Sequence, residues 1–423
     1  MNIQKNSSFD RPFDSLEEFV DAISDRLQCP VTIEDSNHHL LAYSSHTDNT
    51  DKARISTIIG RRVPERVINR FWKEGVIPTL NQSDQPLVIP QINEIGLGNR
   101  IAVSIRKNNE VLGYIWVLEV GRTLTKEDLT DLKLAASKAK NQLLQLNLQK
   151  KKKEKSNQEL LWQMITGDTK NHPDIANQLS KIGLKPNQPL AILLFTFHSI
   201  DDELHKKLVY VAKTTQKINL LIQTVDENQL IFLVSPLFQT NDFNKIAKEF
   251  TDIFKAQVHE RFGISDIRSG CGYAYENYEL IKRSYDEAAK VIALKEIFTK
   301  ELTEANFYHE LGVFRYIDLL QQTEALQDMS MNPAIQKLQS YDLVHHTNLL
   351  ETLDVILDKD GHLNEAAKEL HCHVNTLNYR LKRIQEITAI QLKDPVQKFG
   401  LYLDLKLTRS NDLLKTTKER LQI

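Results

Sequence analysis

Hydrogen-bonding side chains of several kinds recur through one short segment near the end of the chain. They comprise amides, hydroxyls, an imidazole and basic groups: His373, Asn375, Thr376, Asn378, Tyr379, Arg380, Lys382 and Arg383. Amides and guanidinium groups fit the donor and acceptor pattern of base edges in a major groove, whereas Lys, Thr and Tyr suit phosphate oxygens. The residue types therefore predict a surface that reads double-stranded DNA.

A helix is needed to hold these side chains on one surface. Val374, Leu377, Leu381 and Ile384 recur at spacings of three, four and three, which predicts one buried stripe of an α-helix. At 100° per residue, most of the hydrogen-bonding side chains fall on the opposite face. A wholly structural helix more often carries Glu and Lys pairs there.

A second, shorter helix is predicted just before this one. Asn364 is the expected cap, and Ala366, Ala367 and Leu370 make a small apolar face that permits a close helix crossing. The corner at 371–373 is too short for a loop and fits a helix-turn-helix. The spacing alone leaves open a generic helical hairpin in a packed domain.

The same residues carry a family resemblance. The segment contains the order L-x-x-H-x-N-T-L-x-Y-R-L-x-R-I from Leu370 to Ile384, followed by Leu392 and Asp394-Pro395. It resembles the C-terminal helix-turn-helix of the PucR/CdaR family of bacterial transcription regulators. Val374 stands where that family usually has a basic residue, and Ala389 stands where the helix often ends in Gly. The first departure removes an expected phosphate contact, and the second makes the helix end less predictable.

Charge limits how strongly one copy could bind DNA. The chain has 423 residues, 41% of them hydrophobic and 26% charged, with a formal net charge of −2. Residues 363–393 hold five basic and three acidic side chains, a formal charge of +2. That is modest for a DNA-binding segment. We therefore expect a homodimer or a higher even oligomer, with RNA polymerase as a further candidate partner.

Cysteine usage and hydropathy indicate the compartment. Cys29, Cys271 and Cys372 are far apart and odd in number, without a CxxC motif, which indicates a reduced environment. The polar N-terminal 15 residues lack a signal-peptide core, and the longest apolar runs, such as 190–195, are too short to span a bilayer. The expectation is a cytoplasmic protein without a membrane partner.

The N-terminal block mixes helix and strand. A helix is predicted at 16–27 and strands at 31–34, 40–44, 98–106 and 111–119, the last two forming a hairpin. The phrases PVTIEDSNHHLLAYSS and IAVSIRKNNEVLGYIWVLE resemble a GAF or PAS sensor fold.

Such a fold usually encloses a small-molecule pocket, with the insert 54–95 as one wall. The candidate effector-binding residues are Arg61, Arg62, Arg66, Arg70, Arg100, Trp72 and Trp116. The competing interpretation is that the arginines form a solvated helix face and that Trp116 belongs to the core.

One long helix is predicted between Thr125 and Ile165, where the chain has neither Gly nor Pro. Leu129, Leu132, Ala136, Ala139, Leu143 and Leu146 form a heptad-like seam. The seam suggests a parallel dimer helix that carries a signal. Packing of its first half against its own domain is an equal alternative.

The middle block, 166–300, alternates strands and helices. Strands are expected at 190–197, 229–235 and 266–275, and helices at 243–261 and 278–293. The strand around Gly270 and Gly272 and the helix with Ser284-Tyr285-Asp286-Glu287-Ala288 resemble the degenerate GGDEF-like domain of the same family. The Gly-Gly turn with acidic residues that a nucleotide cyclase needs is missing. The block is therefore interpreted as structural or dimerising, without catalytic residues.

Other chemistry finds little support. His371, Cys372, His373 and the upstream pair His345-His346 are metal-ligand types, but adjacent residues rarely point at one metal and no spaced partner follows. No G-x-S-x-G, P-loop or H-E-x-x-H motif is present. We expect no metal, no cofactor and no enzymatic activity.

The C-terminal helices complete a small domain. An opening helix is predicted at 342–358 with Leu343, Leu350, Leu353 and Leu357 inside. A final helix should begin with Asp394 as cap and Pro395 in its first turn. It should bury Val396, Phe399, Leu403 and Leu407.

The predicted fold class is multidomain α+β, with an N-terminal GAF/PAS-like α/β sensor, a central GGDEF-like α/β domain and a C-terminal all-α helix-turn-helix domain. The predicted boundaries are a tail at 1–14, the sensor at 15–124, a signalling or dimerisation helix at 125–165, the GGDEF-like domain at 166–300, a helical linker at 301–340 and the DNA-binding domain at 341–423. The resemblance implies an activator of genes for nitrogen-nutrient use, responding to an amino acid or a purine metabolite. The alternatives are a GAF-regulated nucleotide-signalling enzyme and a protein-interaction scaffold.

Overall fold

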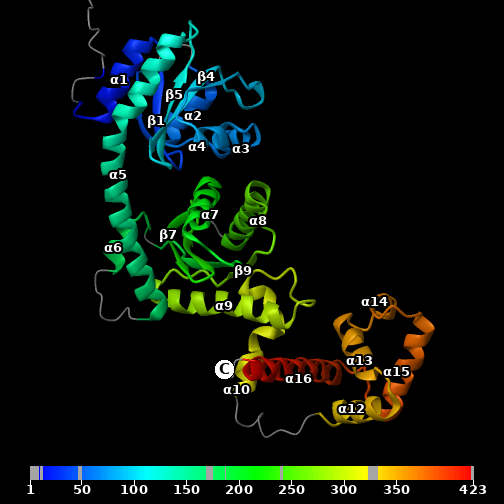
Figure 1. Cartoon of the computed structure of the whole chain (residues 1–423). Coiled ribbons are helices and arrows are strands. Elements are labelled where there is room, and N and C mark those ends of the chain that lie inside the picture. The colour runs from blue at the N-terminus through cyan, green and yellow to red at the C-terminus, as the bar shows by residue number, and fades with distance from the viewer. Residues whose placement is uncertain are drawn as a thin grey trace, which may run out of the picture. The chain divides into compact units, whose positions relative to one another are not determined.

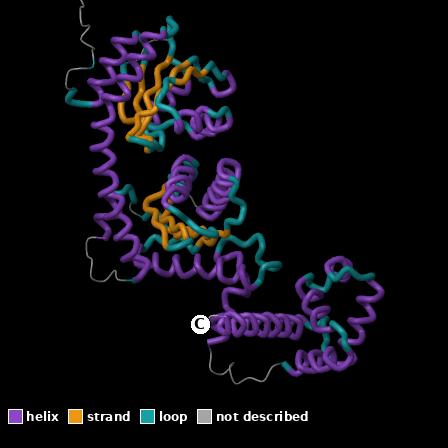
Figure 2. The backbone as a smooth tube through the Cα atoms, in the orientation of Figure 1, coloured by secondary structure: helices purple, strands orange, loops and turns teal. Residues whose placement is uncertain are grey.

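A computed structural model describes residues 9, 13–45, 50–167, 175–185, 187–238, 242–322 and 332–420. The chain forms two compact units, Met1–Ser269 with Ala274–Tyr285, and Gly270–Tyr273 with Asp286–Ile423. Most of the predicted tail 1–14, part of the predicted linker and residues 421–423 lie outside the described residues. Strands occur in the sensor and in the middle domain, while the described chain from 332 onwards is helical (Figure 2). This arrangement confirms the predicted multidomain α+β class.

The N-terminal domain, which we call the sensor after its predicted role, contains a five-stranded antiparallel sheet with the order β2-β1-β5-β4-β3. Its elements are α1 (Leu16–Leu27), β1 (Val31–Asp35), β2 (Leu40–Tyr43), α2 (Lys52–Gly60), α3 (Glu65–Lys73), α4 (Val76–Gln82), β3 (Leu87–Ile89), the 3-10 turn η1 (Asn93–Ile95), β4 (Arg100–Lys107) and β5 (Glu110–Leu118). The predicted hairpin turns at Asn108, whose positive φ of 54° is one that Asn tolerates better than most residues.

Strand periodicity gives the sheet two different faces. Ile33, Val103 and Ile115 point to one face, where α1 and α5 cover them in one hydrophobic core (Figure 1). Ala102 and Trp116 point to the other face, where α2, α3 and α4 contribute a second core. The polar residues of the sheet that line a small cavity lie on this second face.

The predicted long helix is present as α5 (Lys126–Thr166), which begins with a capping box of Thr125 and Asp128. Leu132, Ala136, Ala139 and Leu143 of its seam are buried in the core of the sensor itself. A dimer cannot use that face, because the chain already covers it. The intramolecular alternative is thus correct for this part of the seam, and of the seam leucines Leu146 is 43% exposed.

The middle domain has a four-stranded sheet with the order β7-β8-β6-β9. Its elements are α6 (Ile175–Lys181), β6 (Ala191–Thr196), α7 (Asp202–Thr214), β7 (Asn219–Asp226), β8 (Gln229–Ser235), α8 (Phe243–Phe262), β9 (Arg268–Cys271), the 3-10 turn η2 (Tyr278–Leu280) and α9 (Ile281–Ile297). The expected strands and helices exist, although β9 is shorter than predicted. Helix α7 and strand β7 were not predicted.

The residues behind the GGDEF-like resemblance have structural roles. Ser284 Oγ accepts a hydrogen bond from the backbone N–H of Ile192 at 3.0 Å, and Glu287 Oε2 accepts one from Tyr273 N–H at 2.8 Å. A Cβ atom on Gly270 would lie 2.1 Å from the carbonyl oxygen of Ala288, so only glycine permits this approach of α9 to β9. These contacts fasten α9 to the strands.

The chain then continues through helical segments into the C-terminal domain. They are the 3-10 segment η3 (Tyr308–Tyr316), α10 (Ile317–Gln322), α12 (Pro333–His345), α13 (Leu349–Asp358), α14 (Leu363–Glu369), α15 (Val374–Thr388) and α16 (Pro395–Arg420). Two adjoining cores hold the domain, one around Leu353 and Ile384 and the other around Ala366 and Leu377. Among the described helices, none has both the length and the apolar run needed to cross a bilayer.

The predicted single helix at 342–358 is wrong, because the chain breaks at His346, where φ is 52°. The side chain of Asp342 accepts hydrogen bonds from the backbone N–H groups of Leu349 at 2.8 Å and Leu350 at 2.9 Å. It therefore caps the start of α13 from the end of α12. Leu343 is 78% exposed and not inside as predicted.

Two smaller predictions in this domain are also wrong. Helix α14 begins at Leu363 after His362, so Asn364 lies within its first turn and is not its cap. In α16, Val396 and Phe399 are exposed and Leu403 and Leu407 are half-buried, whereas the buried leucines between 395 and 410 are Leu401 and Leu405. Apolar residues at every second position from 399 to 407 let the sequence support more than one buried face.

Candidate DNA interface and sensor cavity

Helix α15 starts at a histidine cap. His373 Nδ1 accepts a hydrogen bond from the backbone N–H of Asn375 at 3.2 Å, which satisfies one free donor of the first turn. Because Nδ1 is the acceptor, the neutral ring carries its proton on Nε2. The His373 side chain is exposed, so Nε2–H can donate to an external acceptor such as a phosphate oxygen.

The buried stripe of α15 is the predicted one. Leu377 and Ile384 are fully buried, and Val374 and Leu381 pack against the same core as Ala366 and Ala367 of α14. This packing turns the other side of α15 outward. The exposed side chains of its first three turns are Asn375, Thr376, Asn378, Tyr379 and Lys382. We call these five residues the α15 face.

Tyr379 is the most informative member of the α15 face. It is 72% exposed, although burying an aromatic ring would stabilise the fold. It is flanked by two amides and an ammonium group, all of which can reach base edges or phosphates.

Two predicted DNA-binding residues bond within the protein. Arg380 Nη1 donates to Thr352 Oγ1 of α13 at 3.2 Å. Arg383 Nε donates to the Tyr341 hydroxyl of α12 at 3.1 Å, and its Nη1 pairs with Glu386 at 2.9 Å. Both arginines are half-buried, so in this structure they position α15 against α12 and α13.

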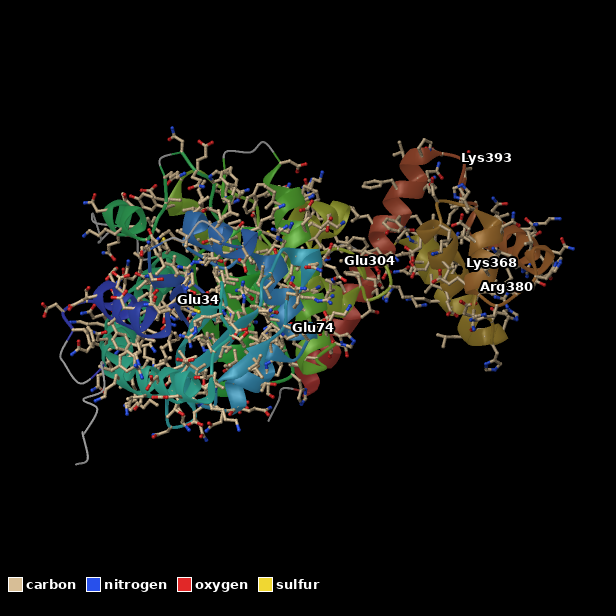
Figure 3. All side chains as sticks on the ribbon, turned by 90° about the horizontal axis from the view of Figure 1, so that it is seen from above. Glu34, Glu74, Glu304, Lys368, Arg380 and Lys393 are labelled. Atoms are coloured by element: carbon tan, nitrogen blue, oxygen red, sulfur yellow. The ribbon has the colours of Figure 1, made fainter. Side chains whose placement is uncertain are left out.

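Basic side chains around the motif remain at the surface. Figure 3 labels Lys368 on α14, Arg380 on α15 and Lys393 before α16. Lys368 and Lys393 are exposed, as is Lys382. These ammonium groups supply a modest local positive charge for a polyanion.

The end of α15 carries backbone strain. Ala389 adopts the left-handed conformation with φ 61°, and its N–H donates to Gln385 O. Glycine takes this conformation without a steric penalty, whereas alanine does not. The family often has Gly at the end of this helix, and here Ala389 adopts the backbone conformation that favours glycine.

A buried lysine anchors α16. The Lys406 side chain is fully buried, and its Nζ lies 2.9 Å from Glu301 Oε1, 2.8 Å from Asp354 Oδ1 and 2.8 Å from Asp358 Oδ1. Although burial lowers it, the attraction of Asp354 and the other carboxylates leaves the pKa of Lys406 above its ordinary value. Arg409 also pairs with Glu301 at 2.7 Å. This cluster ties α13 and α16 to the segment around residue 301.

The sensor contains a small cavity between the second face of the sheet and helices α2 and α3. Strand register places Thr32 opposite Trp116 and aligns Glu34 with Tyr114, on that face. The polar lining consists of Thr32, Glu34, Arg54, Thr57 and Arg100. The apolar lining includes Ala53, Val63, Val67, Phe71 and Trp116. Both arginines and the glutamate are at least 91% buried.

The cavity holds the predicted effector residues only in part. Arg100 and Trp116 line it, and Trp116 stacks on Phe71 with ring centroids 4.9 Å apart. The other five lie elsewhere. Arg61 and Arg66 are exposed, Arg70 pairs with Glu74 and Glu94, and Arg62 and Trp72 bond to the middle domain.

Glu34 and Arg54 were missed as candidate site residues. Arg54 opened the predicted insert but was not singled out, because a charged residue early in a helix is usually solvated. Glu34 alternates with the core residues Val31 and Ile33 along β1, so register was the available signal.

Burial perturbs the charged groups of the cavity. Burial raises the pKa of Glu34 above its ordinary value, while the hydrogen bond to His38 acts in the opposite direction. Burial, together with repulsion from Arg100, lowers the pKa of Arg54 to about 10. Arg54 Nη2 donates to Ser44 O at 3.0 Å, while its Nε has no hydrogen-bond partner among the described residues.

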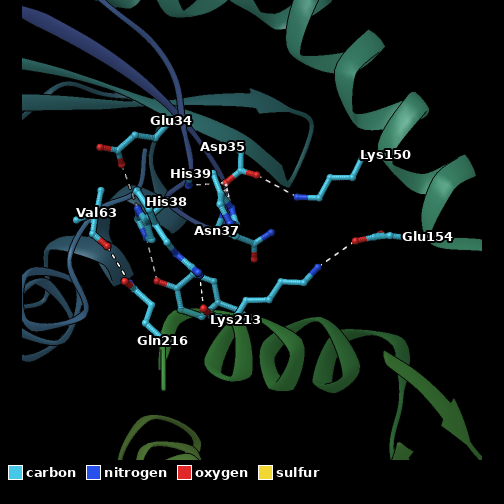
Figure 4. A network of polar contacts seen from close by, with 12 residues as sticks. Glu34, Asp35, Asn37, His38, His39, Val63, Lys150, Glu154, Lys213 and Gln216 are labelled. Carbon is cyan, nitrogen blue, oxygen red and sulfur yellow. Dashed lines mark hydrogen bonds and ion pairs between the residues drawn. The ribbon is translucent and has the colours of Figure 1, made fainter. Parts of the chain in front are cut away.

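A chain of hydrogen bonds connects Glu34 with the middle domain (Figure 4). Glu34 Oε2 lies 3.2 Å from His38 Nδ1, and His38 Nε2 lies 3.0 Å from the Tyr210 hydroxyl of α7. Trp72 Nε1 donates to the same hydroxyl at 3.0 Å. Burial raises the pKa of Tyr210 to about 12, so it stays a neutral phenol.

Further polar contacts join the sensor to the middle domain near this series of hydrogen bonds. Gln216 Nε2 donates to Val63 O at 2.9 Å, and Lys213 pairs with Glu154 of α5 at 3.0 Å. Lys150 of α5 pairs with Asp35 at 3.0 Å. Strand β1, helix α5 and helix α7 are thereby joined by polar contacts next to Glu34.

Comparison with known proteins identifies two parts of the chain. A model of the PucR C-terminal helix-turn-helix domain matches residues 349–407, and a model of the GGDEF-like domain matches residues 166–294. The chain is 44% identical over 403 residues to the DNA-binding transcriptional activator AdeR of Bacillus subtilis, covering 95% of each protein.

Two more distant relatives belong to the same comparison. The proline-responsive transcriptional activator PutR of Bacillus subtilis is 29% identical over 402 residues, which are 94% of this chain and 97% of PutR. The carbohydrate diacid regulator of Escherichia coli is 24% identical over 261 residues, which are 59% of this chain and 65% of that protein.

The buried stripe of α15, its exposed polar face and the matched domain define a helix-turn-helix transcription regulator. With a relative this similar over nearly the whole length, the chain belongs to the PucR family of these regulators. This confirms the resemblance seen around Leu370 to Pro395.

Proposed function

We propose that this protein is a cytoplasmic transcriptional activator that binds an operator through α15 and responds to a small effector in its N-terminal domain. The observation that carries the DNA-binding part is the α15 face, in which exposed amide, hydroxyl and ammonium groups lie opposite a fully packed stripe. The relatives AdeR and PutR, named as transcriptional activators, support the sign of regulation. PutR is named proline-responsive, which favours genes of amino-acid use as targets.

Within the α15 face we assign different tasks. Asn375 and Asn378 would read base edges, with Tyr379 beside them, while Lys382 and Thr376 would contact phosphates. His373 would donate Nε2–H to a phosphate. We assign Arg380 and Arg383 to positioning α15, since both are bonded to α12 or α13.

Binding should require two copies of the chain. The motif has a formal charge of only +2, so each copy releases few counterions from DNA. A homodimer with its two α15 helices about 34–36 Å apart would read successive major-groove faces of a repeated half-site. The buried seam of α5 leaves other surfaces to make that dimer. We further propose that the middle domain relays or dimerises without catalysis, because its family-like residues Ser284 and Glu287 accept hydrogen bonds from backbone N–H groups in β6 and just after β9.

The test is selection of an operator from random duplexes with the full-length protein, followed by fluorescence polarisation at several salt concentrations. Asn375→Ala should weaken specific binding at least tenfold and relax the base preference at one position of each half-site. Lys382→Ala should weaken binding to all sequences and reduce the salt slope by about one per copy.

The matched control is Lys337→Ala, which removes an exposed lysine of α12 outside the motif. It should leave both affinity and salt slope unchanged. Circular dichroism confirms that each variant is folded. If the folded Asn375→Ala variant binds like wild type, the assignment of the α15 face is wrong, and if no duplex is enriched, the DNA-binding function is wrong.

A further inference from the structure

Three kinds of side chain line the cavity of the sensor: basic, acidic and apolar ones. The guanidinium groups of Arg54 and Arg100 and the carboxylate of Glu34 line the same small space. Apolar side chains such as Val67 and Phe71 also line it. The buried set therefore offers a place for an anion, a place for a cation and an apolar surface within one cavity.

The two arginines of the cavity differ in their carboxylate partners. Arg100 forms an ion pair with Asp51, whereas the guanidinium group of Arg54 donates to the carbonyl and hydroxyl oxygens of Ser44 and, among the described residues, forms no ion pair, although the charge of Asp51 attracts it. Arg54 lines the cavity and is 5% exposed, and its Nε has no partner among the described residues. A buried cation with an unused donor is costly unless an acceptor arrives.

The size of the cavity limits the ligand. Its volume is about 20 Å³, enough for roughly one water molecule. A ligand can therefore enter only when α2 and α3 move away from the sheet, and a small ligand needs the smallest movement. Helix α3 also carries Trp72, and Arg62 lies just before it, so this movement would disturb the contacts with α7.

We propose that this cavity binds a small α-amino acid, with its carboxylate between Arg54 and Arg100, its ammonium group at Glu34 and its side chain against Val67 and Phe71. The inference rests on the proposed function, which assigns effector sensing to the N-terminal domain. The ammonium group would compete with His38 for Glu34, and His38 bonds to Tyr210 of the middle domain. Occupation of the cavity is thereby linked to the hydrogen bonds that join the two domains.

The ligand requirement is tested by calorimetric titration of the full-length protein. The probes are glycine, L-alanine, L-serine and L-proline as amino acids, propionate and ethylamine as ligands that keep only one charged group, and hypoxanthine as a purine. At least one small amino acid should bind, and propionate and ethylamine should each bind at least tenfold more weakly than it. Preference for hypoxanthine, or no binding of any amino acid, overturns the proposal.

The residue assignment is tested by two substitutions that affect different parts of the ligand. Arg54→Gln should weaken both amino acid and propionate at least tenfold. Glu34→Gln should weaken the amino acid at least tenfold and leave propionate unchanged, a pattern that general misfolding would not give. Arg61→Gln, at the exposed end of α2, is the matched control and should bind like wild type. Equal loss of both ligands in folded Glu34→Gln overturns the assignment of Glu34.

Operator binding is measured on the same preparations, so that two failures can be separated. If the wild-type protein binds its selected operator but no amino acid of the panel, this inference fails and the proposed DNA-binding function stands. If amino acids bind as described but no operator is enriched, the cavity assignment stands and the proposed function fails.

Discussion

Charged side chains are buried both in the sensor and in the C-terminal domain, and the two sets differ in their partners. In the C-terminal domain, one cation, Lys406, lies within 3.0 Å of three carboxylates. In the sensor, the Arg54 guanidinium group forms no ion pair with a carboxylate within the described part of the chain, and Glu34 has a raised pKa. The comparison shows that the role of a buried charged side chain depends on the charges of its neighbours. A matched cluster fastens helices, whereas a mismatched one suits a ligand that brings the missing charges.

The largest effect is expected for Lys406→Met. It should lower the free energy of unfolding of the C-terminal domain by about 3 kcal/mol, because three carboxylates would be left around an apolar side chain. Urea denaturation followed by circular dichroism measures this change. A loss below about 1 kcal/mol would mean that the cluster is hydrated and would remove the contrast with the sensor.

The opposite sign is expected for Glu34→Gln in the sensor. Glutamine keeps the shape and removes a buried charge, so the ligand-free protein should become more stable by about 1 kcal/mol. The same denaturation experiment measures it at neutral pH. A destabilised variant would show that Glu34 is satisfied within the protein, and it would place Glu34 with Lys406 among the structural charges.

The pH dependence of this gain follows from the raised pKa of Glu34. Below the ordinary pKa of a glutamate, Glu34 is protonated in the folded and the unfolded protein, and the variant should equal wild type. As pH rises, the unfolded chain ionises first, so wild type loses stability relative to the variant until pH passes the raised folded value. Denaturation from pH 4 to pH 8 should show the difference growing with pH, and a constant difference would contradict the role of ionisation.

A smaller gain is expected for Ala389→Gly in the C-terminal domain. Glycine takes the left-handed conformation at the end of α15 freely, so stability should rise by about 0.5–1 kcal/mol. This variant tests whether backbone strain at Ala389 lowers the stability of the C-terminal domain, as the buried charge of Glu34 is expected to lower that of the sensor. Thermal unfolding measures it, and an unchanged midpoint would indicate that the strain is relieved elsewhere.

The smallest effect is expected for Lys398→Met, whose ammonium group pairs with the exposed carboxylate of Asp360. A surface pair contributes little, since water solvates both partners and salt screens them. Denaturation at low and high salt should show no measurable change. It serves as the matched control for Lys406→Met, because both remove a lysine of α16 that is paired with residues near the end of α13.

Local elements could be predicted from the sequence where the pattern was unambiguous. Helix α1 has the predicted bounds because its apolar periodicity is clean, and strand β8 has them because its continuous apolar run is flanked by turn residues. The break at His346 could not be predicted, since it depends on Asp342 capping α13 from the preceding helix. The buried face of α16 was also ambiguous in sequence.

The candidate sites show the same limit. The outward side of α15 follows from its stripe of Val374, Leu377, Leu381 and Ile384, and the exposed residues there agree with it. The turn of Arg383 toward Tyr341 does not follow, because the partner lies 42 positions upstream. The cavity residues Glu34 and Arg54 were hidden for the same reason, since strand pairing and helix placement bring them together.

Helix α5 has a mechanical consequence. Its 41 residues span about 60 Å at 1.5 Å per residue, and its first half belongs to the core of the sensor. The helix continues without a break to Leu160 and Met164 at its far end, which are also buried, so it couples a rotation of that core to the side chains packed there. The helix therefore sets the rotation of its second half about the helix axis relative to its first half. One residue inserted after Leu148 would rotate the second half by about 100°, whereas seven inserted residues would restore the original rotation to within about 20°.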